Sequence, residues 1–123
     1  MGSYKELSVY EKSYQAARAI YLLANSFPKD EQFGLISQIK RAATSIPLNI
    51  AEGYGKGAGY AEVLRFLKMA KGSVAEMEVL LRFSKDFGYI NEIVFEEQNT
   101  QYEEIGRMLS GLMRNLQERQ TSS

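Results

Sequence analysis

The stretch Gln38–Gly53, which reads QIKRAATSIPLNIAEG, decides the fold. In and just before it, apolar residues recur at alternating steps of three and four, a spacing that places them on one side of an α-helix. These residues are Ile36, Ile39, Ala43, Ile46 and Ile50. We therefore predict a helix whose apolar face packs into the protein core.

A polar stripe follows the same spacing on a neighbouring face of this helix. Its members are Gln38, Arg41, Ser45, Asn49 and Glu52. Such side chains need hydrogen-bond partners wherever they are covered, and Ser73 and Glu76 lie in the middle of the next predicted helix. We predict that these seven residues form a structural polar network or an interface. Within it, we expect Arg41 to pair with Glu76 or Glu52 in a partly buried arrangement.

Proline interrupts the helical pattern at position 47. A proline inside a helix lacks a backbone donor and clashes with the carbonyl four residues earlier, here that of Ala43, at a cost of roughly 3 kcal/mol. We predict that the helix kinks near Pro47. Ser45 or Asn49 is close enough to satisfy freed backbone groups nearby.

Length and composition limit the chemistry. A chain of 123 residues fits one domain, 1–123. It has no cysteine and no histidine, which excludes disulfides and removes the commonest general base and metal ligand. The first residues contain no apolar signal region, and the longest apolar run, residues 19–24, is too short to cross a bilayer of about 30 Å. We expect a cytoplasmic protein with no membrane contact.

Four helices are predicted, at residues 9–26, 30–54, 60–86 and 92–118. Ser8 and Glu11 have the spacing of a capping box at the start of the first, and Pro28 or Asp30 suits the first turn of the second. Gly88 is placed to stop the third helix and Asn91 to cap the fourth. Because glycine costs about 1 kcal/mol inside a helix, Gly72 predicts a close approach of another backbone.

The first helix has a second face that an isolated bundle would not require. Tyrosines and alanines line it, namely Tyr10, Tyr14, Ala17, Tyr21 and Ala24. Such a face suggests contact with a partner subunit or a ligand. The alternative is a broad core within one molecule.

Residues 53–59, which read GYGKGAG, form a linker. They do not make a phosphate-binding P-loop, because a predicted helix precedes them and no serine or threonine follows Lys56. Four helices with short connections instead predict an all-α, antiparallel up-down four-helix bundle. Without histidine, the usual di-iron site of such bundles is excluded, and we expect neither a metal nor a cofactor.

An enzyme is a distant alternative. Glu52, Tyr54 and Glu76 could supply proton chemistry, but the sequence identifies no nucleophile, cofactor or substrate pocket to use it. We therefore expect no enzymatic activity and no catalytic residue.

Two motifs in the middle of the chain carry a family resemblance. They are Gln38-x-x-Arg41-Ala42-x-x-Ser45-Ile46-Pro47-x-Asn49-Ile50-Ala51-Glu52-Gly53 and Phe66-Leu67-x-x-Ala70-x-Gly72-Ser73-x-x-Glu76. With the opening Leu7-x-Val9-Tyr10, they closely resemble the bacterial four-helix-bundle proteins encoded in 23S rRNA intervening sequences. The chain departs at Tyr10, where the family often has tryptophan, and at Ala58-Gly59, where a serine commonly caps the third helix.

The resemblance implies a small bundle that assembles into a ring, namely a homopentamer, without enzymatic activity. The chain is more distantly similar to the accessory variability proteins of diversity-generating retroelements, which form pentameric barrels and associate with nucleic acid and reverse transcriptase. This kinship suggests that the protein binds RNA or DNA, and that a partner could be a nucleic-acid-processing protein such as a reverse transcriptase.

The charge pattern supports nucleic-acid binding modestly. The formal net charge is zero, yet residues 40–71 carry six basic residues against two acids. We predict phosphate contacts from Lys40, Lys56, Arg65, Lys68 and Lys71, with exposed tyrosines stacking on unpaired bases. Two alternatives stay open. Arg65, Lys68 and Lys71 could simply keep their helix soluble, and the protein could be an interaction or assembly scaffold without direct nucleic-acid binding.

Overall fold

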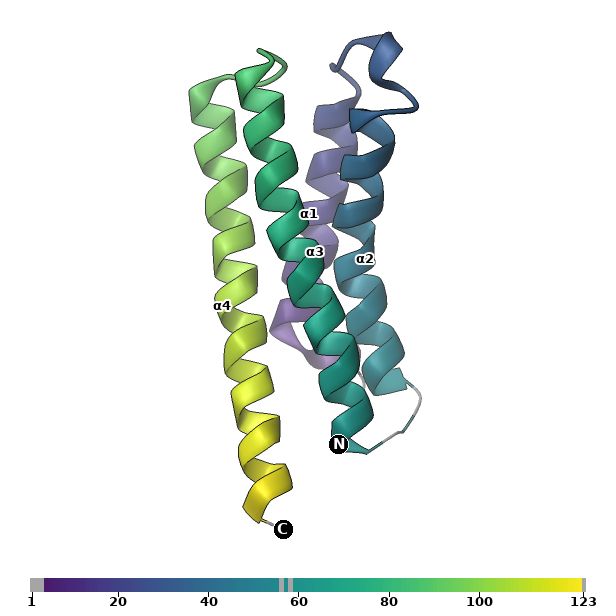
Figure 1. The fold of residues 1–123 in the computed structure, drawn as a ribbon, viewed down its shortest axis with the longest axis vertical. Helices are drawn as coiled ribbons and strands as arrows, with labels where there is room; N and C mark the ends of the chain where they lie inside the picture. The colour runs from purple at the N-terminus through teal and green to yellow at the C-terminus, as the bar shows by residue number, and fades with distance from the viewer. Residues whose placement is uncertain (1–3, 56, 58, 123) are drawn as a thin grey trace.

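The structure is a computed structural model that describes residues 4–55, 57 and 59–122. Its elements are the 3-10 turns η1 (Tyr4–Glu6) and η2 (Lys29–Glu31) and the helices α1 (Ser8–Ala24), α2 (Leu35–Gly55), α3 (Tyr60–Asp86) and α4 (Glu92–Ser122). No strand occurs in this part of the chain. The prediction of an all-α four-helix bundle is confirmed (Figure 1).

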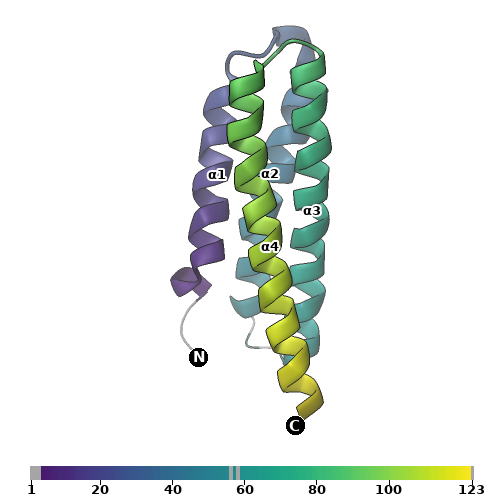
Figure 2. The ribbon, with the colours of Figure 1, turned by 90° about the vertical axis from the view of Figure 1, so that its left-hand side faces the viewer.

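The four helices run side by side along the long axis, and consecutive helices run in alternate directions (Figures 1 and 2). Between α2 and α3, for example, Ser45 contacts Ser73 whereas the later Gly53 contacts the earlier Phe66. Both α1 and α3 pack against α2 and α4. As a result α1 and α3 lie on a diagonal of the bundle, at opposite sides of Figure 2.

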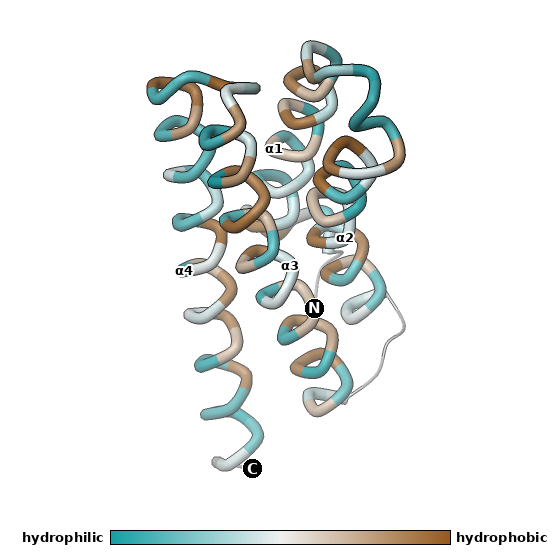
Figure 3. Tube along the Cα trace, turned by 45° about the horizontal axis from the view of Figure 1, so that its top comes forward, coloured by the Kyte–Doolittle hydropathy of each residue, from teal (hydrophilic) through white to brown (hydrophobic). Residues whose placement is uncertain are grey.

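The apolar stripe of α2 lies in the core as predicted. Ile39, Ala43, Ile46 and Ile50 are completely buried, and Ile36 packs against the cluster from its edge. Hydrophobic and hydrophilic positions recur along each helix (Figure 3). Burial of such faces is the main stabilising contribution in a bundle of this kind.

Pro47 lies buried within α2, which continues through it to Gly55. Nearby side chains bond to the backbone on either side of the carbonyl of Ala43. Ser45 Oγ lies 2.7 Å from the carbonyl oxygen of Ala42, and Asn49 Nδ2 donates to the carbonyl of Ser45 at 2.8 Å. These bonds are local to the proline, and the kink itself stays a prediction.

Two predicted helix starts are wrong. Leu7, not Ser8, occupies the N-cap of α1, because its extended backbone presents a carbonyl that accepts from Tyr10 and Glu11. No capping box forms, and Glu11 instead accepts a hydrogen bond from Gln15. The first helix also ends at Ala24 rather than at residue 26.

The second helix begins at Leu35 instead of residue 30, because residues 29–31 form the separate turn η2. Glu31 then caps α2, since its carboxylate accepts from the backbone N–H of Leu35 at 3.2 Å. The helix ends at Gly55, one residue beyond the prediction, and α4 extends past residue 118 to Ser122.

The predicted bounds of α3 and its turn into α4 are confirmed. Gly88 adopts a positive φ of 80°, and its N–H donates to the carbonyl of Lys85, as expected of a glycine that ends a helix. Asn91 Oδ1 accepts from the backbone N–H of Val94 at 2.8 Å, so Asn91 is the N-cap of α4.

The prediction for Gly72 is wrong. Gly72 is exposed, and a Cβ built on it would meet no atom within 4 Å among the residues described. The close contacts occur at two other glycines. A Cβ on Gly53 would lie 3.0 Å from Cβ of Phe66 on α3, and one on Gly106 would lie 3.4 Å from Cγ1 of Val74.

Candidate interaction surfaces

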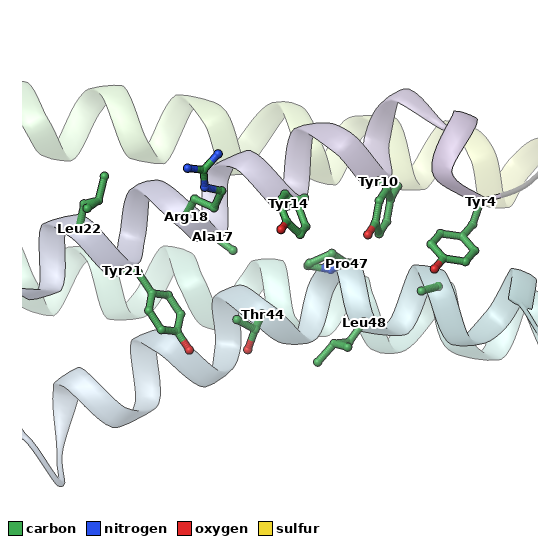
Figure 4. A pocket seen from close by; sticks show the side chains of 11 residues that line it. Tyr4, Tyr10, Tyr14, Ala17, Arg18, Tyr21, Leu22, Thr44, Pro47 and Leu48 are labelled. Atoms are coloured by element: carbon green, nitrogen blue, oxygen red, sulfur yellow. The ribbon is translucent and has the colours of Figure 1, made fainter.

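An open groove of about 620 Å³ lies between α1 and α2 on the outside of the bundle (Figure 4). We call it the tyrosine groove. It is lined by Tyr4, Tyr10, Tyr14, Ala17, Arg18, Tyr21, Leu22, Thr44, Pro47, Leu48 and Ala51. The second face predicted for α1 therefore faces this groove through its three tyrosines and Ala17, whereas Ala24 is buried in the core.

The side chains of the tyrosine groove contact one another but leave much apolar surface uncovered. The Tyr4 and Tyr10 rings meet edge to face at 5.0 Å, and burial is the main cause that raises the pKa of Tyr10. Several of the large lining side chains stay exposed, for example Tyr14 at 45% and Leu48 at 60%. Among the described residues that line the groove, Arg18 alone is charged, so the groove suits an apolar surface.

The polar stripe of α2 forms one wall of a shallow groove against α3. The hydroxyls of Ser45 and Ser73 share a hydrogen bond of 2.6 Å across the two helices, with Asn49 beside them. Arg41 and Glu76 lie at the same groove but are exposed, and no ion pair between described residues includes Arg41. The predicted pairing of Arg41 with Glu76 or Glu52 is therefore wrong.

The remaining members of the polar stripe lie outside this contact. Gln38 and Glu52 are exposed, and the negative charge of Glu52 helps to raise the pKa of Arg65, whose largest cause is the hydrogen bond to Glu62. The hydrogen bond between Ser45 and Ser73 thus joins the two helices, whereas the Asn49 side chain bonds to the Ser45 carbonyl within α2. Arg41 remains available to solvent because the groove is open at that point.

Of the five residues predicted to bind nucleic acid, the four that the structure describes do not gather on one surface. Nζ of Lys40 lies over the Tyr21 ring of α1, 4.8 Å from its centroid, whereas Lys71 lines the groove between α3 and α4. Nε of Arg65 donates to Glu62 at 2.6 Å. Lys68 is exposed on α3, and Lys56 lies outside the described residues.

A second large groove, of about 690 Å³, lies between α3 and α4. We call it the charged groove. It is lined by Lys71, Val74, Ala75, Glu78, Tyr102, Glu103, Gly106, Arg107, Ser110 and Arg114. None of the ion pairs found among the described residues involves Lys71, Arg107 or Arg114. Three cations thus line one groove without a carboxylate in salt-bridge contact.

Sequence reasoning missed Arg107 and Arg114, which fit the usual preference for basic residues late in a helix. Their spacing could have identified them, because residues seven apart lie on the same side of a helix. The small residues Gly106 and Ser110 line the same groove, and a Cβ on Gly106 would lie 3.8 Å from Cε of Lys71 on α3.

Tyr102 lies beneath the charged groove and is completely buried. Its hydroxyl has no hydrogen-bond partner in the part of the chain that the structure describes. Burial raises the pKa of Tyr102 well above its usual range. The phenol therefore stays neutral, and its hydroxyl is an unsatisfied polar group in the core.

The groups considered for proton chemistry are dispersed. Glu76 lies in the α2/α3 groove, Glu52 faces Arg65, and Tyr54 packs against the core, where burial raises its pKa. Among residues 4–55, 57 and 59–122, no cluster of three carboxylates, histidines or cysteines could hold a metal ion. No helix in these segments is long and apolar enough to span a membrane.

Comparison with known proteins agrees with this fold. A family model described as 23S rRNA-intervening sequence protein matches residues 5–111. The chain is also similar to a solved structure from Bacteroides thetaiotaomicron, a protein of unknown function from the S23 ribosomal protein family. The two are 27% identical with a TM-score of 0.79, and the match covers 86% of this chain and 95% of that one. No curated protein matches the chain.

Proposed function

Since the chain belongs to the 23S rRNA-intervening sequence protein family, we propose that it is a non-enzymatic, homo-oligomeric accessory factor that binds RNA or DNA in the bacterial cytoplasm. The most specific form of the proposal is a pentameric ring. The observation that carries it is the charged groove, in which Lys71, Arg107 and Arg114 line one surface.

The cations of this groove suit a phosphate chain better than a single anion. Arg107 and Arg114 are separated by two turns of α4, roughly 10 Å along the helix axis, and Lys71 faces them from α3. Phosphate contacts from lysine and arginine supply most of the sequence-independent affinity for nucleic acid. Glu78 and Glu103 line the same groove, so we expect the affinity of one subunit to be low.

Assembly would compensate for this weak affinity. A ring presents one charged groove per subunit, and a nucleic acid that reaches several grooves gains avidity without any new type of contact. The exposed Tyr14 and Tyr21 belong to the opposite hairpin, and the exposed Tyr60, at the start of α3, is not among the residues that line the charged groove, which argues against base stacking beside these cations. The proposal therefore rests on phosphate contacts, and it predicts little sequence specificity.

The test is fluorescence anisotropy with structured RNA, single-stranded DNA and double-stranded DNA across a salt titration. The variant Arg107→Gln/Arg114→Gln should weaken binding and lower the slope of log K against log salt by about one unit for each phosphate that is no longer neutralised. The matched control Lys29→Gln/Arg65→Gln removes the same charge from two other exposed sites and should bind like the wild type. Equally weakened binding by both variants would contradict the charged groove as the site.

A protein-interaction or assembly scaffold is the second candidate, and the tyrosine groove favours it. A contiguous apolar surface on a soluble domain commonly marks a protein contact. If the wild-type oligomer fails to bind any of the three nucleic acids even at low salt, the scaffold becomes the better proposal.

A further inference from the structure

A second exposed apolar surface lies on α3, away from the tyrosine groove. Val79, Phe83 and Phe87 follow one another at intervals of four along the chain, and their exposed fractions are 54%, 46% and 56%. The rings of Phe83 and Phe87 stack with their centroids 5.6 Å apart. We call these three residues the aromatic ridge. Three large apolar side chains exposed together in this way form a patch suited to a protein contact.

The groove and the ridge lie on different sides of the molecule. The groove runs between α1 and α2 (Figure 4), whereas the ridge belongs to α3, which is diagonal to α1 in the bundle (Figure 2). In a two-fold dimer each surface would meet its own copy. Two different surfaces on separate sides of one subunit instead suit a head-to-tail contact, which closes into a ring when the rotation between subunits allows it.

The two surfaces also differ in shape and charge in a complementary way. The groove is concave, the described residues that line it include Arg18 and no acid, and Lys40 lies over its Tyr21 ring. The ridge projects from a helix whose neighbouring exposed residues Glu76 and Asp86 outnumber the single cation Arg82. Opposite charge around two apolar surfaces favours their association and sets its orientation.

We propose that the tyrosine groove of one copy receives the aromatic ridge of a second copy. This inference rests on the homo-oligomer of the proposed function and names the two surfaces that would build it. It does not depend on nucleic-acid binding. Repetition of the same contact buries one groove and one ridge per subunit, so no apolar surface of either kind remains exposed in a closed ring.

The test uses two full-length variants and their mixture, with molar mass measured by light scattering after size exclusion. The groove variant is Leu22→Glu/Leu48→Glu and the ridge variant is Val79→Glu/Phe83→Glu. All four side chains are at least 46% exposed in one subunit, so each variant should keep wild-type helical content by circular dichroism. A matched control, Phe33→Glu/Ile93→Glu, changes two exposed apolar residues outside both surfaces.

Each variant alone should be monomeric, whereas the control should keep the wild-type mass. Mixing the two variants should give a one-to-one dimer, because one intact groove and one intact ridge remain and the chain of contacts cannot continue. Retention of the wild-type mass by either variant would overturn the proposed contact, as would a mixture that stays monomeric. A nucleic-acid assay that fails while the mixture dimerises would contradict the proposed function alone.

Discussion

The two helical hairpins of the bundle, α1–α2 and α3–α4, are both pairs of packed helices, but their outer surfaces differ in chemistry. Their outer grooves measure about 620 and 690 Å³. Among the described residues, the first is lined mainly by tyrosine and aliphatic side chains with Arg18 as the one charged residue, whereas five of those that line the second are charged. The shared helical period sets the buried face of each hairpin. The outer face does not have to be apolar for the bundle to fold, and its chemistry therefore indicates what kind of partner each hairpin binds.

The floors of the grooves differ as well. Beneath the charged groove lies Gly106, which is buried and lets α4 approach Val74 and Lys71 closely. In the α1–α2 hairpin the corresponding inner wall includes Pro47 and Ala17, which are also buried. The close approach of α3 and α4 therefore depends on one missing side chain, and this difference can be tested directly.

The largest expected effect is that of Gly106→Leu. A Cβ at Gly106 already lies 3.4 Å from Cγ1 of Val74, so a larger side chain must push α4 away from α3. Overpacking of this kind costs about 1–3 kcal/mol, and we expect the free energy of unfolding in urea to fall by that amount. The matched variant is Gly72→Leu, where a Cβ meets no described atom within 4 Å.

Gly72→Leu should keep or raise stability, because a glycine inside a helix costs about 1 kcal/mol relative to a good helix former. If both variants were destabilised to the same extent, tight packing at Gly106 would not explain the effect.

A smaller effect, of opposite sign, is expected from Tyr102→Phe. An unsatisfied buried polar group costs about 1–3 kcal/mol, and the variant removes one such hydroxyl while keeping the ring that fills the core. We expect the free energy of unfolding to rise by about 1 kcal/mol. A fall in stability would instead show that the Tyr102 hydroxyl is hydrogen-bonded in solution.

Most of the helices and turns could be predicted from the sequence because they depend on residues close to one another in the chain. The three-and-four spacing of Ile39, Ala43, Ile46 and Ile50 identified a buried helix face, and Gly88 and Asn91 identified a turn. The start of α2 was missed because Glu31 reaches forward to cap it from a separate 3-10 turn. That arrangement depends on a long-range contact with Tyr89 as well.

The candidate surfaces were harder to predict because they depend on which helices become neighbours. Lys40 and Lys71 looked alike in the sequence, yet one faces α1 and the other faces α4. Arg107 and Arg114 became candidate phosphate-binding residues only because the fold places Lys71 of α3 in the same groove. The tyrosine face of α1, in contrast, could be predicted from spacing alone. Its tyrosines all belong to one helix, so helical periodicity is enough to place them on one side.

The smallest predicted effect concerns the contact that joins the two hairpins at their connections. The Tyr89 hydroxyl donates to Glu31 at 2.7 Å, and this bond is the largest cause that lowers the pKa of Glu31 and raises that of Tyr89. Folding favours the charged form of Glu31. Its contribution to the free energy of unfolding is therefore fully present above the unfolded pKa and is lost as the pH falls through the folded pKa. For Tyr89 the sign is reversed, and the contribution is lost as the pH rises through its folded pKa.

Tyr89→Phe should therefore destabilise the protein slightly near neutral pH, and its difference from the wild type should narrow below about pH 4 and above about pH 10, the ordinary ranges of these groups. Urea unfolding at a series of pH values measures this difference. Tyr60→Phe, at an exposed tyrosine of α3, should show no such dependence. A Tyr89→Phe difference that stays constant at acid pH would mean that Glu31 contributes to stability only through its cap at Leu35, and not through its bond to Tyr89.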